Sequence, residues 1–157
     1  MADVTLTPMT EAQFAVFRAT AEEGYARQIA DSGATSWQDA QDKAAADYAR
    51  LLPDGLATAE HHLWHAYDGE TSVGVLWLHI APKATGSEAY VYDIAVDEGL
   101  RRSGYGRAIM RAAEEECRGR GVVSIGLNVF AQNTAARRLY EQEGYELTSL
   151  QMRKRLT

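Results

Sequence analysis

The chain has 157 residues, of which 46% are hydrophobic and 24% charged, and its formal net charge is −6. This length suits one domain with a core, here residues 1–157, and the composition excludes disordered and fibrous proteins. The negative charge argues against non-specific nucleic-acid binding and slightly favours a cationic or neutral substrate.

Membrane insertion and disulfide bonding are both disfavoured by the sequence. No apolar run approaches the ~20 residues of a membrane-spanning helix, and the acidic N-terminus is unlike a signal peptide. The single cysteine, Cys117, allows no disulfide within the chain. We therefore expect a cytoplasmic protein that does not associate with membranes.

The N-terminal third predicts a short strand at residues 4–7 and then two helices. Thr10 with Gln13 fits a capping box for the first helix, and Ser36 fits the cap of a second helix that ends at Pro53. Two such helices could form a movable wall over a site. Tyr25 and Trp37 are the candidates for substrate contacts on that wall, and core packing is the alternative for both.

The middle of the chain predicts a hairpin followed by a strand–helix–strand crossover. Asp68-Gly69 lies between two strand-like runs at residues 63–67 and 73–80, which is typical of a tight hairpin. A strand at 88–96, a helix at 106–118 and a strand at 122–129 then form a β-α-β unit, whose two strands should be parallel.

A metal site is suggested by four histidines and rejected on their geometry. They are His61, His62, His65 and His79. On one strand His62 and His65 should point to opposite faces, and no complete set of ligands is evident. We expect no metal.

The loop between the strand at 88–96 and the helix at 106–118 is the strongest candidate for a ligand site. Gly104 and Gly106 allow close backbone approach where the helix begins. Its first amides lack internal acceptors and lie at the positive end of the helix dipole. Arg101, Arg102 and Arg107 add positive charge, so the loop predicts an anion cradle for a pyrophosphate. A glycine-containing turn with solvated arginines is the alternative.

The C-terminal quarter predicts a helix and two short strands. Asn133 fits the N-cap of the helix and Gly144 its C-terminal stop. Residues 145–147 and 150–156 have strand-like patterns. The complete order gives an α/β domain with a mixed, mostly antiparallel sheet of about seven strands flanked by about four helices.

Two motifs resemble those of the GCN5-related N-acetyltransferases (GNAT), which transfer an acetyl group from acetyl-CoA to an amine. The first is Ile94-Ala95-Val96 followed by Arg101-Arg102-Ser103-Gly104-Tyr105-Gly106. The second is Asn133-x-x-Ala136-x-x-Leu139-Tyr140-Glu141-x-x-Gly144-Tyr145. Both occur in the family's order with a fitting separation, and together they span about residues 90–145.

The resemblance implies a splayed pair of parallel strands that forms the acetyl-CoA cleft. The loop amides would hold the pyrophosphate, and backbone groups of the strand before it would pair with the pantetheine arm. The cofactor-binding residues implied are Ile94, Ala95, Val96, Arg101, Arg102, Ser103, Gly104, Tyr105, Gly106, Arg107 and Asn133. For Asn133, helix capping is an equally good explanation.

The resemblance also implies a reaction by direct attack of the amine on the thioester. The Val96 amide is the candidate donor to the developing oxyanion. Tyr140 is the candidate acid that protonates the leaving thiolate, and burial beside Leu139 is its alternative role.

The general base is the point at which the sequence departs from familiar family patterns. Positions where some members carry glutamate align with Tyr90 and Asn128. Asp93 is the nearest carboxylate on the central strand, and Glu88 is a second choice. Regular alternation predicts that Asp93 points away from Tyr90 and Tyr92. A water chain without a single base is the alternative.

The acceptor is not identified by any motif. The charge slightly favours a small-molecule amine over a protein, and a CoA-binding sensor without chemistry is the alternative function. Many family members form dimers, often through C-terminal strands, and residues 152–156 alternate as an edge strand does, so a homodimer is one option.

Overall fold

The computed structural model describes residues 2–33 and 35–157. Four α-helices form within this part of the chain, as the sequence predicts. The elements in chain order are β1 (Thr5–Pro8), α1 (Glu11–Asp31), α2 (Trp37–Leu51), η1 (Gly55–Ala57), β2 (His61–Asp68), β3 (Thr71–Ala81), β4 (Ser87–Val96), η2 (Glu98–Leu100), α3 (Tyr105–Gly119), β5 (Val122–Leu127) and α4 (Thr134–Gln142).

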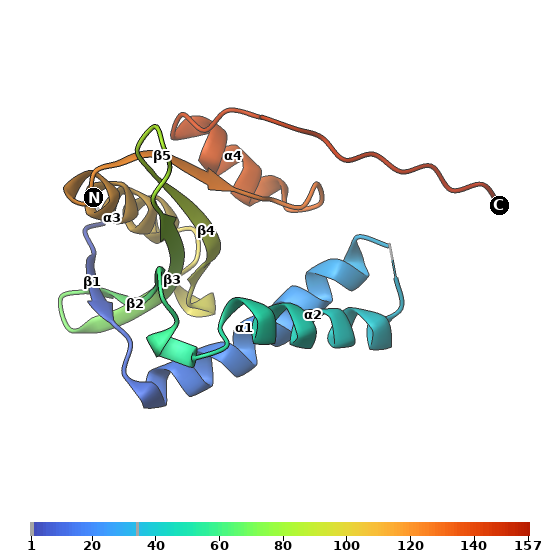
Figure 1. The fold of residues 1–157 in the computed structure, drawn as a ribbon, viewed down its shortest axis with the longest axis horizontal. Helices are drawn as coiled ribbons and strands as arrows, with labels where there is room; N and C mark the ends of the chain where they lie inside the picture. The colour runs from blue at the N-terminus through green and yellow to red at the C-terminus, as the bar shows by residue number, and fades with distance from the viewer. Residues whose placement is uncertain (1, 34) are drawn as a thin grey trace.

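The strands form one five-stranded sheet in the order β1-β2-β3-β4-β5 (Figure 1). Neighbours from β1 to β4 are antiparallel, and β4 and β5 are parallel. The predicted crossover is therefore confirmed, with α3 connecting the two parallel strands. The predicted hairpin is also present, because Asp68 of β2 pairs with Thr71 of β3 across a turn in which Gly69 has φ 61°.

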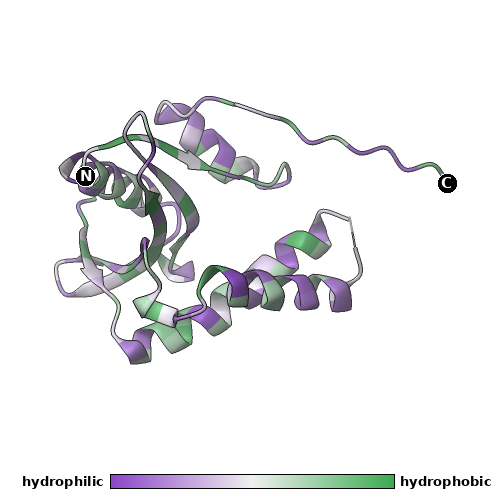
Figure 2. Ribbon diagram, viewed as in Figure 1, coloured by the Kyte–Doolittle hydropathy of each residue, from purple (hydrophilic) through white to green (hydrophobic). Residues whose placement is uncertain are grey.

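The two faces of the sheet carry separate hydrophobic clusters. On one face, Phe17 of α1 and Tyr48 of α2 pack on Trp77 of β3. On the other, Ile109 and Met110 of α3 pack with inward side chains of β2, β3 and β4. Figure 2 shows hydrophobic residues concentrated on the central strands and polar residues on the outer helix faces. Burial of both faces fixes the register of the central strands.

The helix starts follow the predicted capping chemistry. The Thr10 side chain accepts from the Gln13 amide while the Gln13 side chain accepts from the Thr10 amide. Ser36 caps α2 by accepting from the Asp39 amide at 3.2 Å. Among the described residues, no helix is long and apolar enough to cross a membrane.

The prediction of about seven strands is wrong, because the last two do not form. Residues 146–157 lie in an extended path without a partner strand among the described residues, and Leu150 is 70% and Met152 89% exposed. Instead, Arg153 and Arg155 donate to the carbonyls of Ser32 and Gly33. An alternating pattern produces a strand only where an adjacent strand supplies hydrogen bonds.

Candidate active site

A β-bulge in β4 places an acidic and an aromatic side chain on the same face of the sheet. Trp77 of β3 lies opposite Asp93, and the next residue, Leu78, lies opposite Val91. Tyr92 is therefore an extra residue in β4. Its ring stacks on Trp77 with centroids 4.8 Å apart. Asp93 thus shares a face with Tyr92, and the expectation from regular alternation is wrong.

The same bulge returns Asp93 to the face that carries Tyr90. Tyr90 lies opposite His79, which is two residues from Trp77 along β3 and so points to the same side. The Tyr90 and Tyr92 rings lie 4.8 Å apart. Two tyrosines and one carboxylate of β4 therefore face the helices α1 and α2.

β4 and β5 separate immediately beyond the bulge. Their pairing ends at Val91 with Leu127, whereas β4 continues to Val96. The Asp97 amide donates to the Val73 carbonyl at 2.9 Å. By the alternation of an antiparallel ladder, the N–H and C=O groups of Ile94 and Val96 then point away from β3, toward the open edge.

The carboxyl group of Asp93 is largely removed from solvent, and this burial changes its pKa. Burial raises the pKa of Asp93 to about 6, with a smaller opposing effect from a backbone hydrogen bond of Ile94. Burial and then the charge of Asp93 raise the pKa of Tyr140 to about 12. The same two causes raise the pKa of Tyr48. Asp93 therefore lies within electrostatic range of a phenol on α2 and a phenol on α4.

A cluster of aromatic side chains, formed by Tyr48, Trp77 and His61, extends from the side of the sheet that carries Asp93 toward β2. The Tyr48 ring meets Trp77 edge-on with centroids 5.4 Å apart. The Trp77 indole N–H donates to Nδ1 of His61 at 2.9 Å. Burial, followed by the neighbouring His79, lowers the pKa of His61 to about 4. His61 is thus a neutral acceptor at physiological pH, and it holds the orientation of Trp77.

The two candidates for substrate contacts have different surroundings. Tyr25 donates to Asp47 at 3.0 Å, and its ring is 6.1 Å from that of Tyr48. Tyr25 therefore lies next to the aromatic cluster of Tyr48, Trp77 and His61. Trp37 is the first residue of α2, is 42% exposed and lies against the Arg27 guanidinium at 5.5 Å. A substrate contact for either residue stays a prediction.

The loop before α3 has the geometry of an anion cradle. Arg102 and Gly104 have positive φ, 65° and 84°, and among the described residues no side chain caps α3. The left-handed conformation costs a non-glycine residue roughly 1 kcal/mol. The Tyr105 hydroxyl donates to Asp68 of the β2–β3 hairpin at 2.6 Å. These contacts fix a loop whose first helical amides are available to an anion.

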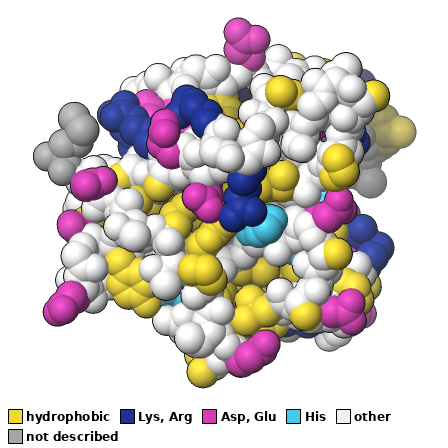
Figure 3. Space-filling model, turned by 60° about the vertical axis from the view of Figure 1, so that its left-hand side comes forward, with side chains coloured by type: hydrophobic (Ala, Val, Ile, Leu, Met, Phe, Trp, Pro, Cys, Tyr) yellow, Lys and Arg dark blue, Asp and Glu magenta, His cyan; other side chains and the backbone are white. Residues whose placement is uncertain are grey.

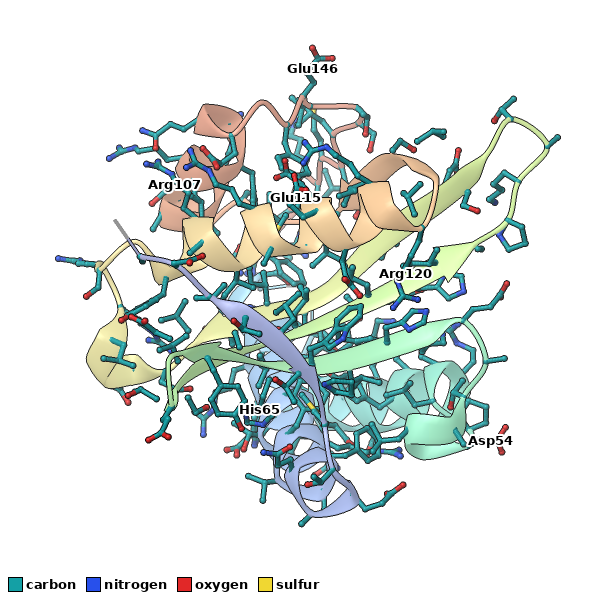
Figure 4. The ribbon with its side chains drawn as sticks, turned by 90° about the vertical axis from the view of Figure 1, so that its left-hand side faces the viewer. Asp54, His65, Arg107, Glu115, Arg120 and Glu146 are labelled. Atoms are coloured by element: carbon teal, nitrogen blue, oxygen red, sulfur yellow. The ribbon has the colours of Figure 1, made fainter. Side chains whose placement is uncertain are left out.

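Only part of the predicted positive charge faces this loop. Arg107 donates to Gln142 at 2.8 Å and lies 3.3 Å from Glu143, so its side chain is turned toward α4 (Figure 4). Glu143 also pairs with Arg111 at 2.8 Å. A contribution of the Arg107 charge to anion binding stays a prediction, with this charge paired to Glu143 in the structure. Arg101 approaches the Val96 carbonyl at 3.4 Å.

The second motif positions α4 against this loop. Asn133 caps α4 by accepting from the Ala136 amide at 3.3 Å. A Cβ at Gly106 would lie 3.2 Å from the Leu139 side chain. Glycine at this position therefore allows α4 to pack close to the start of α3, and Tyr140 follows directly on that helix.

Sequence reasoning did not identify Tyr48, Trp77 and His61 as residues of the candidate active site. Each lies in an apolar or strand-like pattern that predicts core packing equally well. Among residues 2–33 and 35–157, no cluster of three or more potential metal ligands occurs. On the face drawn in Figure 3, basic and acidic side chains are interspersed among hydrophobic ones.

A sequence model described as the acetyltransferase (GNAT) family matches residues 20–145. The chain belongs to the GNAT family. This GNAT protein is 36% identical to the uncharacterized N-acetyltransferase YycN of Bacillus subtilis, over 98% of this chain and 99% of that protein. It is 32% identical to the uncharacterized N-acetyltransferase YdgE of the same organism, over 97% and 98% of the two chains.

Solved structures show the same fold. The crystal structure of the putative acetyltransferase YycN from Bacillus subtilis matches with a TM-score of 0.94 and 35% identity, over 98% of this chain and 99% of that one. A putative acetyl transferase from Pyrococcus furiosus matches with a TM-score of 0.70 and 26% identity, over 98% and 100%. The protein is therefore an N-acetyltransferase of a family that uses acetyl-CoA.

Proposed function

We propose that this GNAT enzyme transfers the acetyl group of acetyl-CoA to the primary amine of a small molecule by direct attack. The observation that carries the proposal is the position of Asp93. The β4 bulge places its carboxylate beside the point where β4 and β5 separate, within electrostatic range of Tyr140.

The chain offers two features that fit CoA. The uncapped start of α3, with Gly104 and Gly106, supports pyrophosphate binding by the loop amides and by Arg101 and Arg102. The open-edge groups of Ile94 and Val96 can pair with an amide-bearing arm as an added strand would. Acetyl-CoA, when bound, supplies an activated acyl carbon. In this proposal the cofactor-binding residues are Ile94, Ala95, Val96, Arg101, Arg102, Ser103, Gly104, Tyr105, Gly106, Arg107 and Asn133, with Arg107 contributing its backbone amide.

Three groups of the chain divide the chemistry in this proposal. A new C–N bond forms as the C–S bond of the thioester breaks. The Val96 amide donates to the carbonyl oxygen as its negative charge grows. Asp93, directly or through water, takes the proton that the nitrogen loses, and Tyr140 donates to the departing sulfur.

The raised pKa values fit this division of roles. With a pKa of about 6, Asp93 is ionised at neutral pH and can accept a proton. With a pKa of about 12, Tyr140 stays protonated and can donate. Because the charge of Asp93 is one cause of the raised pKa of Tyr140, protonating Asp93 makes Tyr140 a better donor.

The surroundings of Asp93 support an amine acceptor. A carboxylate bordered by Tyr48, Tyr92 and Trp77 can attract an ammonium group, since aromatic faces and carboxylates both favour cations. The net charge of −6 acts in the same direction. Tyr25 of α1 and Trp37 of α2 are the substrate-binding candidates in this proposal. The unpaired Cys117 suits the cytoplasmic location that we also propose.

Thiol release from acetyl-CoA in the presence of different amines tests the proposal. The panel contains polyamines, aminoglycosides, amino acids, amino sugars and peptides with free N-termini, and mass spectrometry checks each for the added acetyl group. We expect acetylation of one small-molecule class. Acetylation of peptides alone would contradict the small-molecule assignment. Acetyl-CoA binding without transfer to any amine would support the sensor alternative.

A further inference from the structure

A group of aromatic rings extends the sheet face that carries Asp93. This ring platform consists of His61 of β2, His79 of β3, and Tyr90 and Tyr92 of β4. His61 and His79 are cross-strand partners whose ring centroids lie 4.6 Å apart. The Tyr92 ring lies 5.7 Å from that of His61 and 4.8 Å from that of Tyr90. Four rings from three adjacent strands therefore form one continuous aromatic surface.

The helices leave the ring platform partly open. Phe17 and Tyr48 cover Trp77, which is 1% exposed. Tyr92 stacks on the same indole and is nevertheless 37% exposed, and the side chain of His79 is 28% exposed. In Figure 1 the joined ends of α1 and α2 extend away from the sheet. Rings that served only the core would be covered as Trp77 is, so this part of the face is open to a ligand.

The β-bulge in β4 is the reason that Tyr92 and Asp93 share this face. In a regular strand these consecutive residues would point to opposite faces of the sheet. The extra residue at Tyr92 brings both to the side of Trp77. Bulges next to active sites commonly change the direction of a side chain in this way. The bulge therefore places an exposed ring directly beside a buried carboxylate.

The imidazole of His61 contributes an uncharged ring to the platform. Burial, followed by the neighbouring His79, lowers the pKa of His61 to about 4. Its Nδ1 accepts from the Trp77 indole N–H at 2.9 Å, so the neutral ring carries its proton on Nε2. A neutral imidazole beside two phenol rings offers flat surfaces for stacking rather than a charge.

Asp93 has no cationic partner among the described residues, and burial is the main influence on its pKa, which it raises to about 6. Acidic side chains of the two helices on this side of the sheet are already paired. Asp47 of α2 lies 3.0 Å from Lys43, and Glu22 of α1 lies 3.7 Å from Arg18. The site is therefore matched to one ammonium group rather than to the several cations of a polyamine or an aminoglycoside.

We propose that the acceptor is a monoamine whose amino group is joined by a short chain to a planar aromatic ring. This inference rests on the proposed function of the same site. The amino group lies at Asp93 and the ring stacks on Tyr92, with His61 and His79 beside it. The chain between them is short because Tyr92 and Asp93 are consecutive residues. Stacked rings prefer centroid separations of about 4.5–7 Å, which the rings of the platform keep among themselves.

The acetylation rates of matched amines test this proposal. The probes are 2-phenylethylamine, its saturated counterpart 2-cyclohexylethylamine, the ring-free hexylamine and the polycation spermidine. We expect kcat/KM for 2-phenylethylamine to be several-fold above that for the saturated compound, and roughly tenfold or more above those for hexylamine and spermidine. Equal values for the two cyclic amines, or a preference for hexylamine or spermidine, would overturn the proposal and leave acetyl transfer itself intact.

Substitution of Tyr92 tests the stacking partner. Tyr92→Leu keeps an apolar side chain but removes the ring, so KM for 2-phenylethylamine should rise several-fold and the preference over 2-cyclohexylethylamine should disappear. Tyr92→Phe is the matched control, because it retains the ring, and it should keep the preference. Circular dichroism checks that both variants are folded. An unchanged preference in Tyr92→Leu would overturn the assignment of the ring to the platform.

Saturation-transfer NMR with the CoA-bound protein measures binding without the reaction. Saturation of the protein should reach the ring protons of 2-phenylethylamine more strongly than its methylene protons, and Tyr92→Leu should remove this difference. Binding directed by the ring without any acetylated product would support the platform and contradict the proposed function. A lack of binding of 2-phenylethylamine would overturn the inference, whichever other amine is acetylated.

Discussion

Burial and then the charge of Asp93 raise the pKa of Tyr140 to about 12, although Asp93 lies on β4 and Tyr140 on α4. The bulge at Tyr92 turns Asp93 to the face of Trp77, and Gly106 lets α4 pack against the start of α3. Tyr140 of α4 packs with the hydrophobic cluster of α3 and remains within electrostatic range of Asp93. A proton accepted by one group therefore changes the proton affinity of the other.

Tyr140→Phe should lower kcat by roughly 10²-fold or more, the usual contribution of a positioned proton donor. The affinity for acetyl-CoA should stay the same, because the ring and its packing remain. Steady-state kinetics measures the first quantity and calorimetric titration the second.

Tyr145→Phe is the matched control for that variant. The Tyr145 ring lies 5.8 Å from that of Tyr140, but its hydroxyl is buried without a hydrogen-bond partner among the described residues. Its removal should leave kcat unchanged and should not destabilise the protein. Equal losses of kcat in both variants would contradict the assignment of Tyr140.

Asp93→Asn should lower kcat/KM at neutral pH and remove an ionisation with a pKa of about 6 from the pH profile. In wild type, activity should fall as the pH drops below this value, because the carboxylate becomes protonated. Glu88→Gln, on the same strand, is the comparison. If Glu88→Gln no longer shows the fall in activity at low pH and Asp93→Asn still shows it, Glu88 is the base.

Asp93→Asn should also change the stability of the protein in a pH-dependent way. The pKa of Asp93 is raised in the folded state, so the folded protein binds more protons than the unfolded chain between about pH 4 and 6. Ionising Asp93 therefore costs stability as the pH rises through this window. Asp93→Asn should raise the free energy of unfolding at pH 7 by up to about 3 kcal/mol and have little effect below about pH 4. Denaturant titrations at both pH values measure this, and a loss of stability at pH 7 would contradict it.

Gly104→Ala should weaken the binding of CoA. Gly104 has φ 84° at the start of α3, and a Cβ there costs about 1–2 kcal/mol and displaces the first amides. Gly99→Ala is the matched control, because Gly99 lies in the same connection, has no positive φ, and has open space where an added Cβ would lie. Calorimetric titration with CoA should show a several-fold weaker affinity in the first variant only. Similar affinities would place the pyrophosphate elsewhere.

Glu143→Gln should loosen α4. Glu143 is 10% exposed and pairs with both Arg107 and Arg111 of α3, so its loss should reduce the free energy of unfolding by about 1 kcal/mol or more. Glu141→Gln removes a more exposed pair with Arg137 within α4 and should change stability by less than about 0.5 kcal/mol. Denaturant unfolding compares the two. A larger effect at Glu141 would show that the α3–α4 pair does not hold the helix.

The sequence was sufficient for the parts of the fold that depend on local signals. The capping box at Thr10, the Asp68-Gly69 turn and the crossover through α3 each follow from neighbouring residues, and each is present in the structure. The loop glycines likewise indicated the positive φ at Gly104.

The parts that failed depend on contacts between distant segments. The bulge at Tyr92 arises from the register of β4 against β3, and no local residue pattern marks it. The pairing of Arg107 with Glu143, which is 36 positions later in the chain, was likewise not predicted. The two C-terminal strands were predicted from alternation alone, but strand formation requires a partner edge that local sequence does not specify.

Acetyl transfer by wild type and Tyr140→Phe, measured with the acceptor found in the amine panel, tests the central claim most directly. We expect acetylated product from wild type, a loss of roughly 10²-fold in kcat for the variant, and equal acetyl-CoA affinity for both. Wild-type turnover in Tyr140→Phe would contradict the proposed chemistry of Asp93 and Tyr140.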